Sequence, residues 1–226
     1  MELVLDASST STLVGVARQG ALLWTGRPVQ PEEHTLRLVP EMLAGLEETA
    51  TAPSGIELVT VALGPGAFNA LRVSVSAAKG FAAGTGAALV GIETLLAEAL
   101  RCPPAARRVR PVLRASRSGY ATAVYAWRDA RWQKAEEEQF VDEGTLATLI
   151  DVETPLCGEE IVELCERLRQ LLRVSLPVVS PVPQSRLQAL AAEGWRRYRA
   201  GNVPPAASLQ PVYLRPPHIT VPRDRR

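Results

Sequence analysis

Hydrophobic and polar positions alternate in three short runs at the start of the chain. Leu3-Val4-Leu5 is apolar and ends in the polar stretch 6–11, and further apolar runs follow at 13–16 and 21–24, with Gln19-Gly20 between them. Short apolar runs bounded by polar or glycine-containing turns are typical of strands joined by hairpins. The opening therefore predicts a three-stranded β-meander.

Spacing typical of helices begins at Leu36. Leu36, Val39, Leu43 and Leu46 recur at helical intervals, and Pro40 is expected either to kink this helix or to lie in its first turn. The next predicted elements are a strand at 57–63, a helix at 70–83, a strand at 87–90 and a helix at 93–101. The order β-β-β-α-β-α-β-α predicts an α/β fold whose sheet has a parallel centre and an antiparallel edge.

A proline-containing break at Cys102-Pro103-Pro104 divides the chain. We place an N-terminal lobe at 1–102 and a smaller C-terminal lobe at 103–226. The elements predicted for the second lobe are strands at 109–113, 120–127 and 131–139 and helices at 144–150, 159–172 and 184–200. The tail from Gly201 is rich in proline and is expected to wrap the surface or to be disordered.

Composition excludes several classes of protein. The 226 residues are 46% hydrophobic and 22% charged, which is typical of a globular chain. Lys+Arg 25 against Asp+Glu 24 leaves no global field that would attract nucleic acid or a membrane. Cys102, Cys157 and Cys165 form no metal-binding spacing, and the last two read as core residues of a protein in a reducing compartment. With no signal-peptide pattern, we expect a cytoplasmic protein.

Few residues offer catalytic chemistry. The chain has no Walker A loop, no complete dinucleotide-binding glycine pattern and no G-x-S-x-G elbow. His34 and His218 are too far apart in sequence for a local two-histidine metal site, and His34 is expected to be a helix-start or surface residue. We therefore expect no catalytic residues, no metal and no cofactor.

The turn at Asp6-Ala7-Ser8-Ser9-Thr10 allows two interpretations. Asp6 could hold hydrated Mg²⁺ while Ser8, Ser9 and backbone N–H groups meet a phosphate. Alternatively, the same side chains could bond only to nearby backbone in a polar hairpin. The absence of a glycine at position 8 favours the hairpin, so we regard Asp6, Ser8 and Ser9 as at most a vestigial phosphate turn.

The helix predicted at 70–83 is apolar on nearly all sides. It follows Gly64-Pro65-Gly66, a turn that could bind an anion or simply be tight, with Asn69 as the helix N-cap. A helix of this kind lies either in a core or at an interface, and its small residues favour close approach by another helix. We therefore predict a partner interface. Its expected residues are Phe68, Leu71, Arg72, Val75, Ala78, Lys79 and Ala82.

Four runs of sequence resemble the TsaB (YeaZ) family in order and spacing. They are LVLDASS at 3–9, EHTLRLVP at 33–40, GPGAFNALRV at 64–73 and PVYLR at 211–215. The resemblance implies a two-lobed actin/hexokinase/Hsp70-like (RNase H-like) fold, with mixed sheets flanked by helices. It also implies an accessory subunit of tRNA threonylcarbamoyladenosine (t6A) synthesis, without catalytic activity of its own. Such a subunit pairs with the catalytic homologue TsaD, allows the ATPase TsaE to join, and meets tRNA only through the complex.

The chain departs from the family pattern at two turns. Ala67-Phe68-Asn69-Ala70 stands where the family usually has Ser-Phe-Thr-Gly, and Arg114-Ala115-Ser116 where it has Asp-Ala-Arg. The H-x-x-x-H pair of catalytic relatives is absent from the sequence. Two alternatives stay open: a small-molecule kinase of the type III pantothenate kinase kind, and a binding module that forms a homodimer through the same helix.

Overall fold

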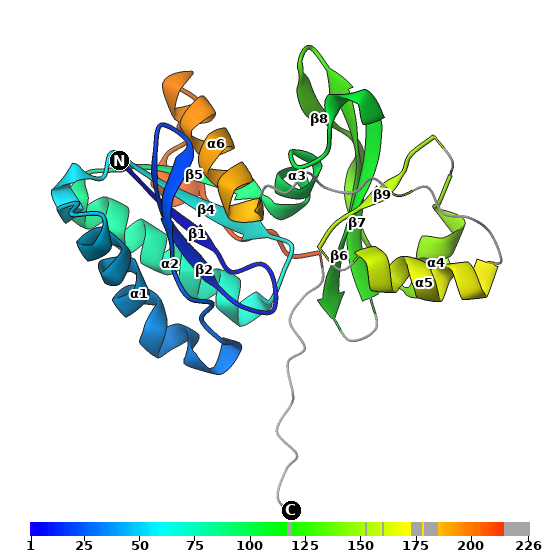
Figure 1. Ribbon diagram of the computed structural model, residues 1–226, viewed down its shortest axis with the longest axis horizontal. Coiled ribbons are helices and arrows are strands. Elements are labelled where there is room, and N and C mark those ends of the chain that lie inside the picture. The colour runs from blue at the N-terminus through cyan, green and yellow to red at the C-terminus, as the bar shows by residue number, and fades with distance from the viewer. Residues whose placement is uncertain (117–118, 152, 160, 173–177, 179–184, 215–226) are drawn as a thin grey trace, which may run out of the picture.

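The first lobe is built on a five-stranded mixed sheet (Figure 1). The computed structural model describes residues 1–116, 119–151, 153–159, 161–172, 178 and 185–214. The strands of this sheet are β1 (Glu2–Asp6), β2 (Leu13–Arg18), β3 (Ala21–Thr25), β4 (Leu58–Gly64) and β5 (Ala88–Glu93). Their order is β3-β2-β1-β4-β5, with antiparallel pairing from β1 to β3 and parallel pairing among β1, β4 and β5. The predicted meander and parallel centre are confirmed.

Helices cover both faces of this sheet because its strands are apolar on both sides. Leu3 and Leu5 of β1 pack with α1 (His34–Glu48) and α2 (Phe68–Thr85) in one core cluster. Val4 points to the opposite face, which α3 (Thr94–Ala99) and α6 (Arg186–Arg199) cover. Each face of the first sheet therefore has its own pair of helices.

The second lobe is a four-stranded sheet with helices on one face. Its strands, β6 (Arg108–Ser116), β7 (Gly119–Arg128), β8 (Arg131–Val141) and β9 (Leu156–Cys157), lie in the order β8-β7-β6-β9. Helices α4 (Glu143–Thr148) and α5 (Ile161–Leu172) complete one apolar cluster with it, and α3 contacts the other side. Short 3-10 turns occupy η1 (Pro31–Glu33), η2 (Pro53–Gly55), η3 (Pro104–Ala106) and η4 (Ala206–Ser208). The predicted α/β class, with mixed sheets flanked by helices, is confirmed.

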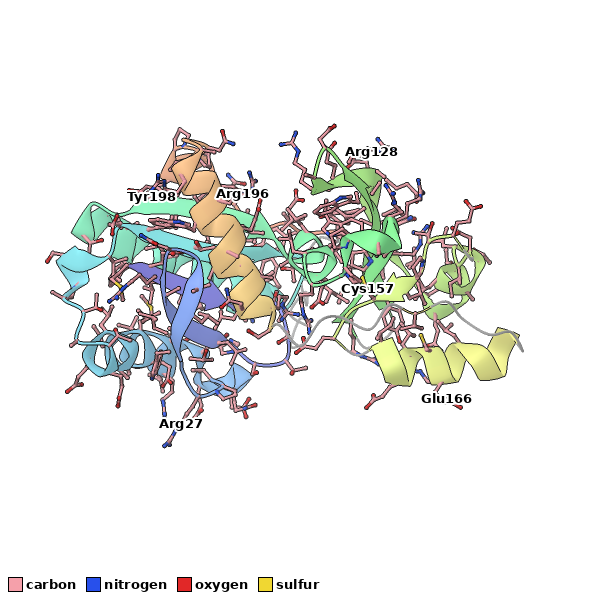
Figure 2. The ribbon with its side chains drawn as sticks, turned by 45° about the horizontal axis from the view of Figure 1, so that its top comes forward. Arg27, Arg128, Cys157, Glu166, Arg196 and Tyr198 are labelled. Atoms are coloured by element: carbon pink, nitrogen blue, oxygen red, sulfur yellow. The ribbon has the colours of Figure 1, made fainter. Side chains whose placement is uncertain are left out.

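The end of the described chain lies against the first lobe. Helix α6 packs on β1, β4 and β5, and Leu209 is buried in the α1–α2 core cluster. The N–H of Val212 donates to the carbonyl of Leu63 at 2.8 Å. Figure 2 shows Arg196 and Tyr198 on α6 beside the first sheet, with Arg128 and Cys157 in the second lobe. Residues 186–199 and 209–212 therefore pack on the first lobe, which corrects their assignment to a C-terminal lobe of 103–226; residues 215–226 of the predicted tail lie outside the described residues.

Several single-residue expectations can also be compared with the structure. Cys157 and Cys165 are buried, as predicted. His34 is the first residue of α1, as expected, but it is buried and shares a 2.9 Å contact between its Nε2 and Oγ1 of Thr12. Pro40 lies inside α1, beyond its first turn. In the described part of the chain, no helix combines the length and apolar character needed to cross a membrane.

One face of α2 belongs to the core of the chain. Val75, Ala78 and Ala82 are 4%, 0% and 5% exposed and pack with Leu3 and Leu5 of the central strand. These three residues of the predicted partner interface are therefore covered by the chain's own core and are not open to a partner. When a helix is apolar on nearly all sides, its sequence does not show which side packs on the sheet. In this structure the side that carries Val75 packs on the sheet.

The two sides of α2 should respond differently to the same added charge. Val75→Glu buries a carboxylate without a counter-ion, so we expect the free energy of unfolding to fall by roughly 4 kcal/mol or more. Ser76→Glu places the same group on the exposed side and should change stability by less than about 0.5 kcal/mol. Urea unfolding of both variants measures the difference. Equal stability of the two variants would contradict the orientation of α2.

Candidate functional site

The turn after β1 contains side-chain hydrogen bonds of its own. The N–H of Ser8 donates to Oδ1 of Asp6 at 3.0 Å, and the Ser8 hydroxyl donates to the same oxygen. The Ser9 hydroxyl donates to the carbonyl of Ser11 at 3.3 Å. These are the side-chain bonds expected for the hairpin interpretation. Asp6 and Ser8 are buried, whereas Thr10 at the far end of the turn is exposed.

The Gly64-Pro65-Gly66 turn packs directly against this hairpin. A β-carbon at Gly66 would lie 2.6 Å from the carbonyl oxygen of Ser8, so only glycine allows the approach. Gly64 has a φ of +99°, which other residues rarely adopt. The helix that follows begins at Phe68 with Ala67 as N-cap and without a side-chain cap bond, which corrects the expected cap at Asn69.

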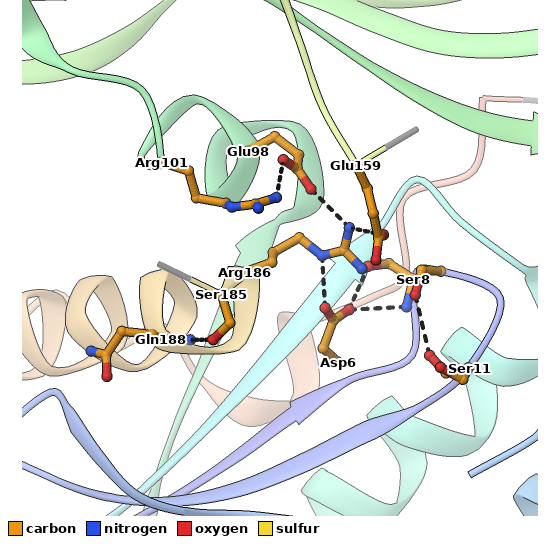
Figure 3. Close-up of polar contacts among 10 residues, drawn as sticks. Asp6, Ser8, Ser11, Glu98, Arg101, Glu159, Ser185, Arg186 and Gln188 are labelled. Carbon is orange, nitrogen blue, oxygen red and sulfur yellow. Dashed lines mark hydrogen bonds and ion pairs between the residues drawn. The ribbon is translucent and has the colours of Figure 1, made fainter. Parts of the chain in front are cut away.

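A single arginine occupies the centre of the site (Figure 3). The guanidinium of Arg186, at the start of α6, contacts three carboxylates that come from three other segments. Its Nε donates to Oδ2 of Asp6 at 2.7 Å, and its NH1 group donates to Glu98 at 2.8 Å and to Glu159 at 2.9 Å. The other oxygen of Glu98 accepts from Arg101 at 2.7 Å. Asp6 is thus half of a buried ion pair in addition to its role in the turn.

The charges of this cluster stabilise each other against burial. Burial by itself raises the pKa of Asp6, but Arg186 and the hydrogen bonds from Ser8 outweigh it, and the pKa lies below its usual value. Burial likewise disfavours the charged form of Arg186, yet its three carboxylate neighbours, Asp6 first, raise the pKa of the guanidinium. Both groups therefore stay ionised at neutral pH.

A pocket of about 200 Å³ lies beside this cluster, between the first turn and β6. Its polar lining residues are Ser8, Ser9 and Thr10 of the first turn, with Arg114 and Glu159 from the second lobe. Within the described ranges, no group of three or more His, Cys, Asp or Glu side chains is placed to hold a metal ion. The carboxylate that could have held hydrated Mg²⁺ instead binds Arg186.

A second candidate surface is the outer side of α1 and α2, which lie together over one face of the first sheet (Figure 1). On α2 the exposed residues include Arg72, Ser76 and Gly80, and a β-carbon added at Gly80 or Gly84 would meet no atom within 4 Å. The exposed apolar side chains on α1 are Leu36, Val39 and Leu43, at 78%, 50% and 52% exposure. This surface, which we call the α1–α2 outer face, combines exposed apolar side chains with positions where a second backbone can come close.

The predicted interface residues are divided between this face and the core. Leu71, Val75, Ala78 and Ala82 are buried in the chain, whereas Arg72 is exposed and Phe68 and Lys79 are half-buried. Phe68 is held in a stack: its ring lies 4.7 Å from that of Tyr213, and the guanidinium of Arg72 lies 5.3 Å from its centroid.

Sequence reasoning missed the central groups of both surfaces. Arg186, Glu98 and Glu159 carry no local signal, because their partners are distant in sequence. An arginine in the first turn of a helix was the one available hint, since the helix dipole disfavours a cation there. The outer side of α1 was also missed, because Leu36, Val39 and Leu43 were grouped with Leu46 as one apolar stripe.

Comparisons with known proteins agree on one family. The sequence model described as TsaD: tRNA N6-adenosine threonylcarbamoyltransferase matches residues 28–161, which is more than half of the chain. The protein TsaB of Escherichia coli, named for tRNA threonylcarbamoyladenosine biosynthesis, is 32% identical over 66 residues, or 29% of each chain. An uncharacterized protein of Mycobacterium tuberculosis is 28% identical over 95 residues, which cover 41% of this chain and 45% of that protein. The matched segments thus span less than half the length of these curated relatives.

A solved structure establishes the fold over nearly the whole chain. YeaZ from Pseudomonas aeruginosa superposes with a TM-score of 0.72 and a sequence identity of 23%. The superposition covers 94% of this chain and 99% of the YeaZ chain. The fold described above, with its two mixed sheets and flanking helices, is therefore shared over nearly the whole length of both chains.

Asp6→Asn tests the strength of the ion pair. Removing one partner of a buried pair should lower the free energy of unfolding by about 3 kcal/mol at pH 7, more than turn hydrogen bonds alone would account for. The pKa of Asp6 is lowered in the folded chain, so its contribution is complete above the ordinary aspartate pKa of about 4 and is lost as the pH falls through the folded value. The difference in the free energy of unfolding between wild type and Asp6→Asn should therefore become smaller as the pH is lowered.

The exposed Asp129→Asn variant is the matched control and should leave stability within about 0.5 kcal/mol at every pH. Urea unfolding between pH 7 and pH 3 measures both variants. An Asp6→Asn protein as stable as wild type at pH 7 would show that the pair contributes nothing.

Proposed function

The chain belongs to the TsaD (tRNA N6-adenosine threonylcarbamoyltransferase) family as a TsaB/YeaZ-like member, and we propose that it is a non-catalytic partner subunit of t6A synthesis. In this proposal it works in the cytoplasm, binds the catalytic homologue TsaD and keeps it in an active form. TsaE joins the assembled pair, and the threonylcarbamoyl group is transferred to adenosine 37 of tRNA on TsaD.

The α1–α2 outer face is the observation that carries the partner role. Helices α1 and α2 each bury one side against the sheet, and α1 presents Leu36, Val39 and Leu43 on its other side. Single exposed apolar residues are ordinary, but several on one helix beside a stripe of Ser76, Gly80 and Gly84 favour helix packing across an interface. Helices of a homologous subunit would bury these side chains, and small residues allow the backbones to approach.

The state of the first turn supports a subunit without catalysis. Asp6 is buried and paired with Arg186, so it is not available to a Mg²⁺–phosphate complex. Glu159 adds a negative charge to the wall of the adjoining pocket, which disfavours a polyphosphate there. Both features count against the kinase alternative. The homodimeric alternative uses the same α1–α2 outer face, and we propose that the chain pairs with itself there only when TsaD is absent.

Gly80→Glu tests the α1–α2 outer face without damaging the fold. A side chain at this position meets open space, and glutamate favours the helix more than glycine does, so the free chain should melt at or above the wild-type temperature. In a complex with TsaD the carboxylate would be buried without a partner, so we expect the affinity to fall by at least about a hundredfold. Titration calorimetry with purified TsaD measures the affinity.

Two further variants define the surface. Leu36→Glu, on α1, should weaken the complex in the same way, whereas Ala105→Glu, on an exposed turn of the second lobe, should bind TsaD normally. If Gly80→Glu and Leu36→Glu bind as wild type does, the interface lies on another part of the molecule.

The proposal also predicts catalytic silence. The purified chain should neither hydrolyse ATP nor form threonylcarbamoyladenosine on tRNA, and activity should appear when TsaD and TsaE are added. Phosphate release and nucleoside analysis by mass spectrometry measure the two reactions. ATP turnover by the isolated chain that disappears in Asp6→Asn would instead support the kinase alternative.

A further inference from the structure

We propose that Asp6, Glu98 and Glu159 form a guanidinium-binding site that the chain fills with its own Arg186, and that this contact latches the two lobes together. The site concerns this chain alone and does not depend on the proposed role in t6A synthesis. Its occupant is a tethered cation, held where two-lobed proteins commonly close around a separate ligand.

The first argument is the arrangement of the carboxylates. They approach the guanidinium from different segments: Asp6 ends β1, Glu98 lies in α3, and Glu159 precedes α5 in the second lobe (Figure 3). Each bond is between 2.7 and 2.9 Å long, as expected of charge-assisted hydrogen bonds. The three carboxylates surround the planar guanidinium group, whose N–H donors point in several directions. Among the described residues, no three acidic, His or Cys side chains are placed to hold a metal ion.

The second argument is that Arg186 is placed against local preference. It is the first residue of α6, where the helix dipole disfavours a positive charge, and its side chain is only 6% exposed. Burial of a guanidinium is unfavourable unless several acceptors surround it. Since the local structure opposes the charge, the three carboxylates must be what retains it at this position.

The third argument is the position of the bonds relative to the lobes. Arg186 and Asp6 belong to the first sheet and its helices, while Glu159 belongs to the second lobe and lines the pocket between them. Helix α3, which carries Glu98, also joins the lobes through a continuous apolar cluster. The Arg186–Glu159 bond adds a polar contact between the lobes at the edge of the pocket that Glu159 lines.

Chemical rescue tests the site. Arg186→Ala leaves a guanidinium-sized space and three carboxylates, so its melting temperature should fall well below that of wild type. Guanidinium chloride denatures proteins only in the molar range. At about 10 mM it should instead bind the folded variant and recover at least half of the fall in melting temperature. Sodium chloride at the same concentration should not. Wild type and the matched control Arg199→Ala, at an exposed position on the same helix, should gain nothing from guanidinium.

The latch has its own measurement. Nitroxide labels on cysteines introduced at Arg128 and Ala200, one exposed position on each lobe, report the spacing of the lobes; the three native cysteines are buried. Glu159→Gln reduces the contact between the lobes from an ion pair to a hydrogen bond with a neutral acceptor, and Arg186 keeps Asp6 and Glu98 as its charged partners. We expect a broader distance distribution for Glu159→Gln and for Arg186→Ala, and guanidinium should narrow only the second.

Each failure overturns a defined part of the proposal. The guanidinium site is wrong if guanidinium stabilises Arg186→Ala no more than sodium does, if Arg199→Ala gains equally, or if Arg186→Ala does not fold even with guanidinium present. The latch is wrong if the label distances of wild type, Glu159→Gln and Arg186→Ala coincide. None of these measurements involves a second protein, so they leave the proposed partnership with TsaD untouched.

Discussion

One buried guanidinium joins the start of α6 to three other segments of the chain. Arg186 is an ion in a region that excludes water, and it is stable there only because Asp6, Glu98 and Glu159 surround it. These four residues come from β1, α3, α6 and the segment before α5. Satisfying a single buried charge therefore requires all four segments to be in place together, and α6 packs on the first sheet although the second lobe separates the two in the sequence.

The same contacts link the ion cluster to the α1–α2 outer face. Asp6 holds the hairpin through Ser8, and Gly66 packs against the backbone of Ser8 with no room for a side chain. Helix α2 begins two residues later, so its position depends on that contact. Tyr213 then stacks on Phe68 in the first turn of α2, which ties the last described residues to the same corner. The inner charges and the outer apolar surface thus share one short turn.

The two faces of the first sheet belong to separate core clusters, so one face can support the charge cluster while the other supports the α1–α2 outer face. Side chains alternate along β1, so Leu3 and Leu5 support α1 and α2 while Val4 supports α3 and α6. One face is covered by α3 and α6, and α3 connects it to the second lobe. The other carries two helices whose outer sides meet solvent, and there the chain has apolar side chains that its own fold does not cover.

Short-range pattern was sufficient for most elements and for the class of the fold, but it did not predict the two-residue strand β9. Alternation in the first strands, helical spacing and the glycine–proline turns predicted the mixed sheet because each of these signals lies within a few consecutive residues. It could not decide which side of α2 faces the sheet, since an apolar residue occurs on nearly every side of that helix. Nor could it find the pairing of Asp6 with Arg186, which are 180 positions apart. Contacts between distant segments leave no periodicity to read, so the buried charge cluster and the orientation of α2 were decided only when the tertiary structure brought those segments together.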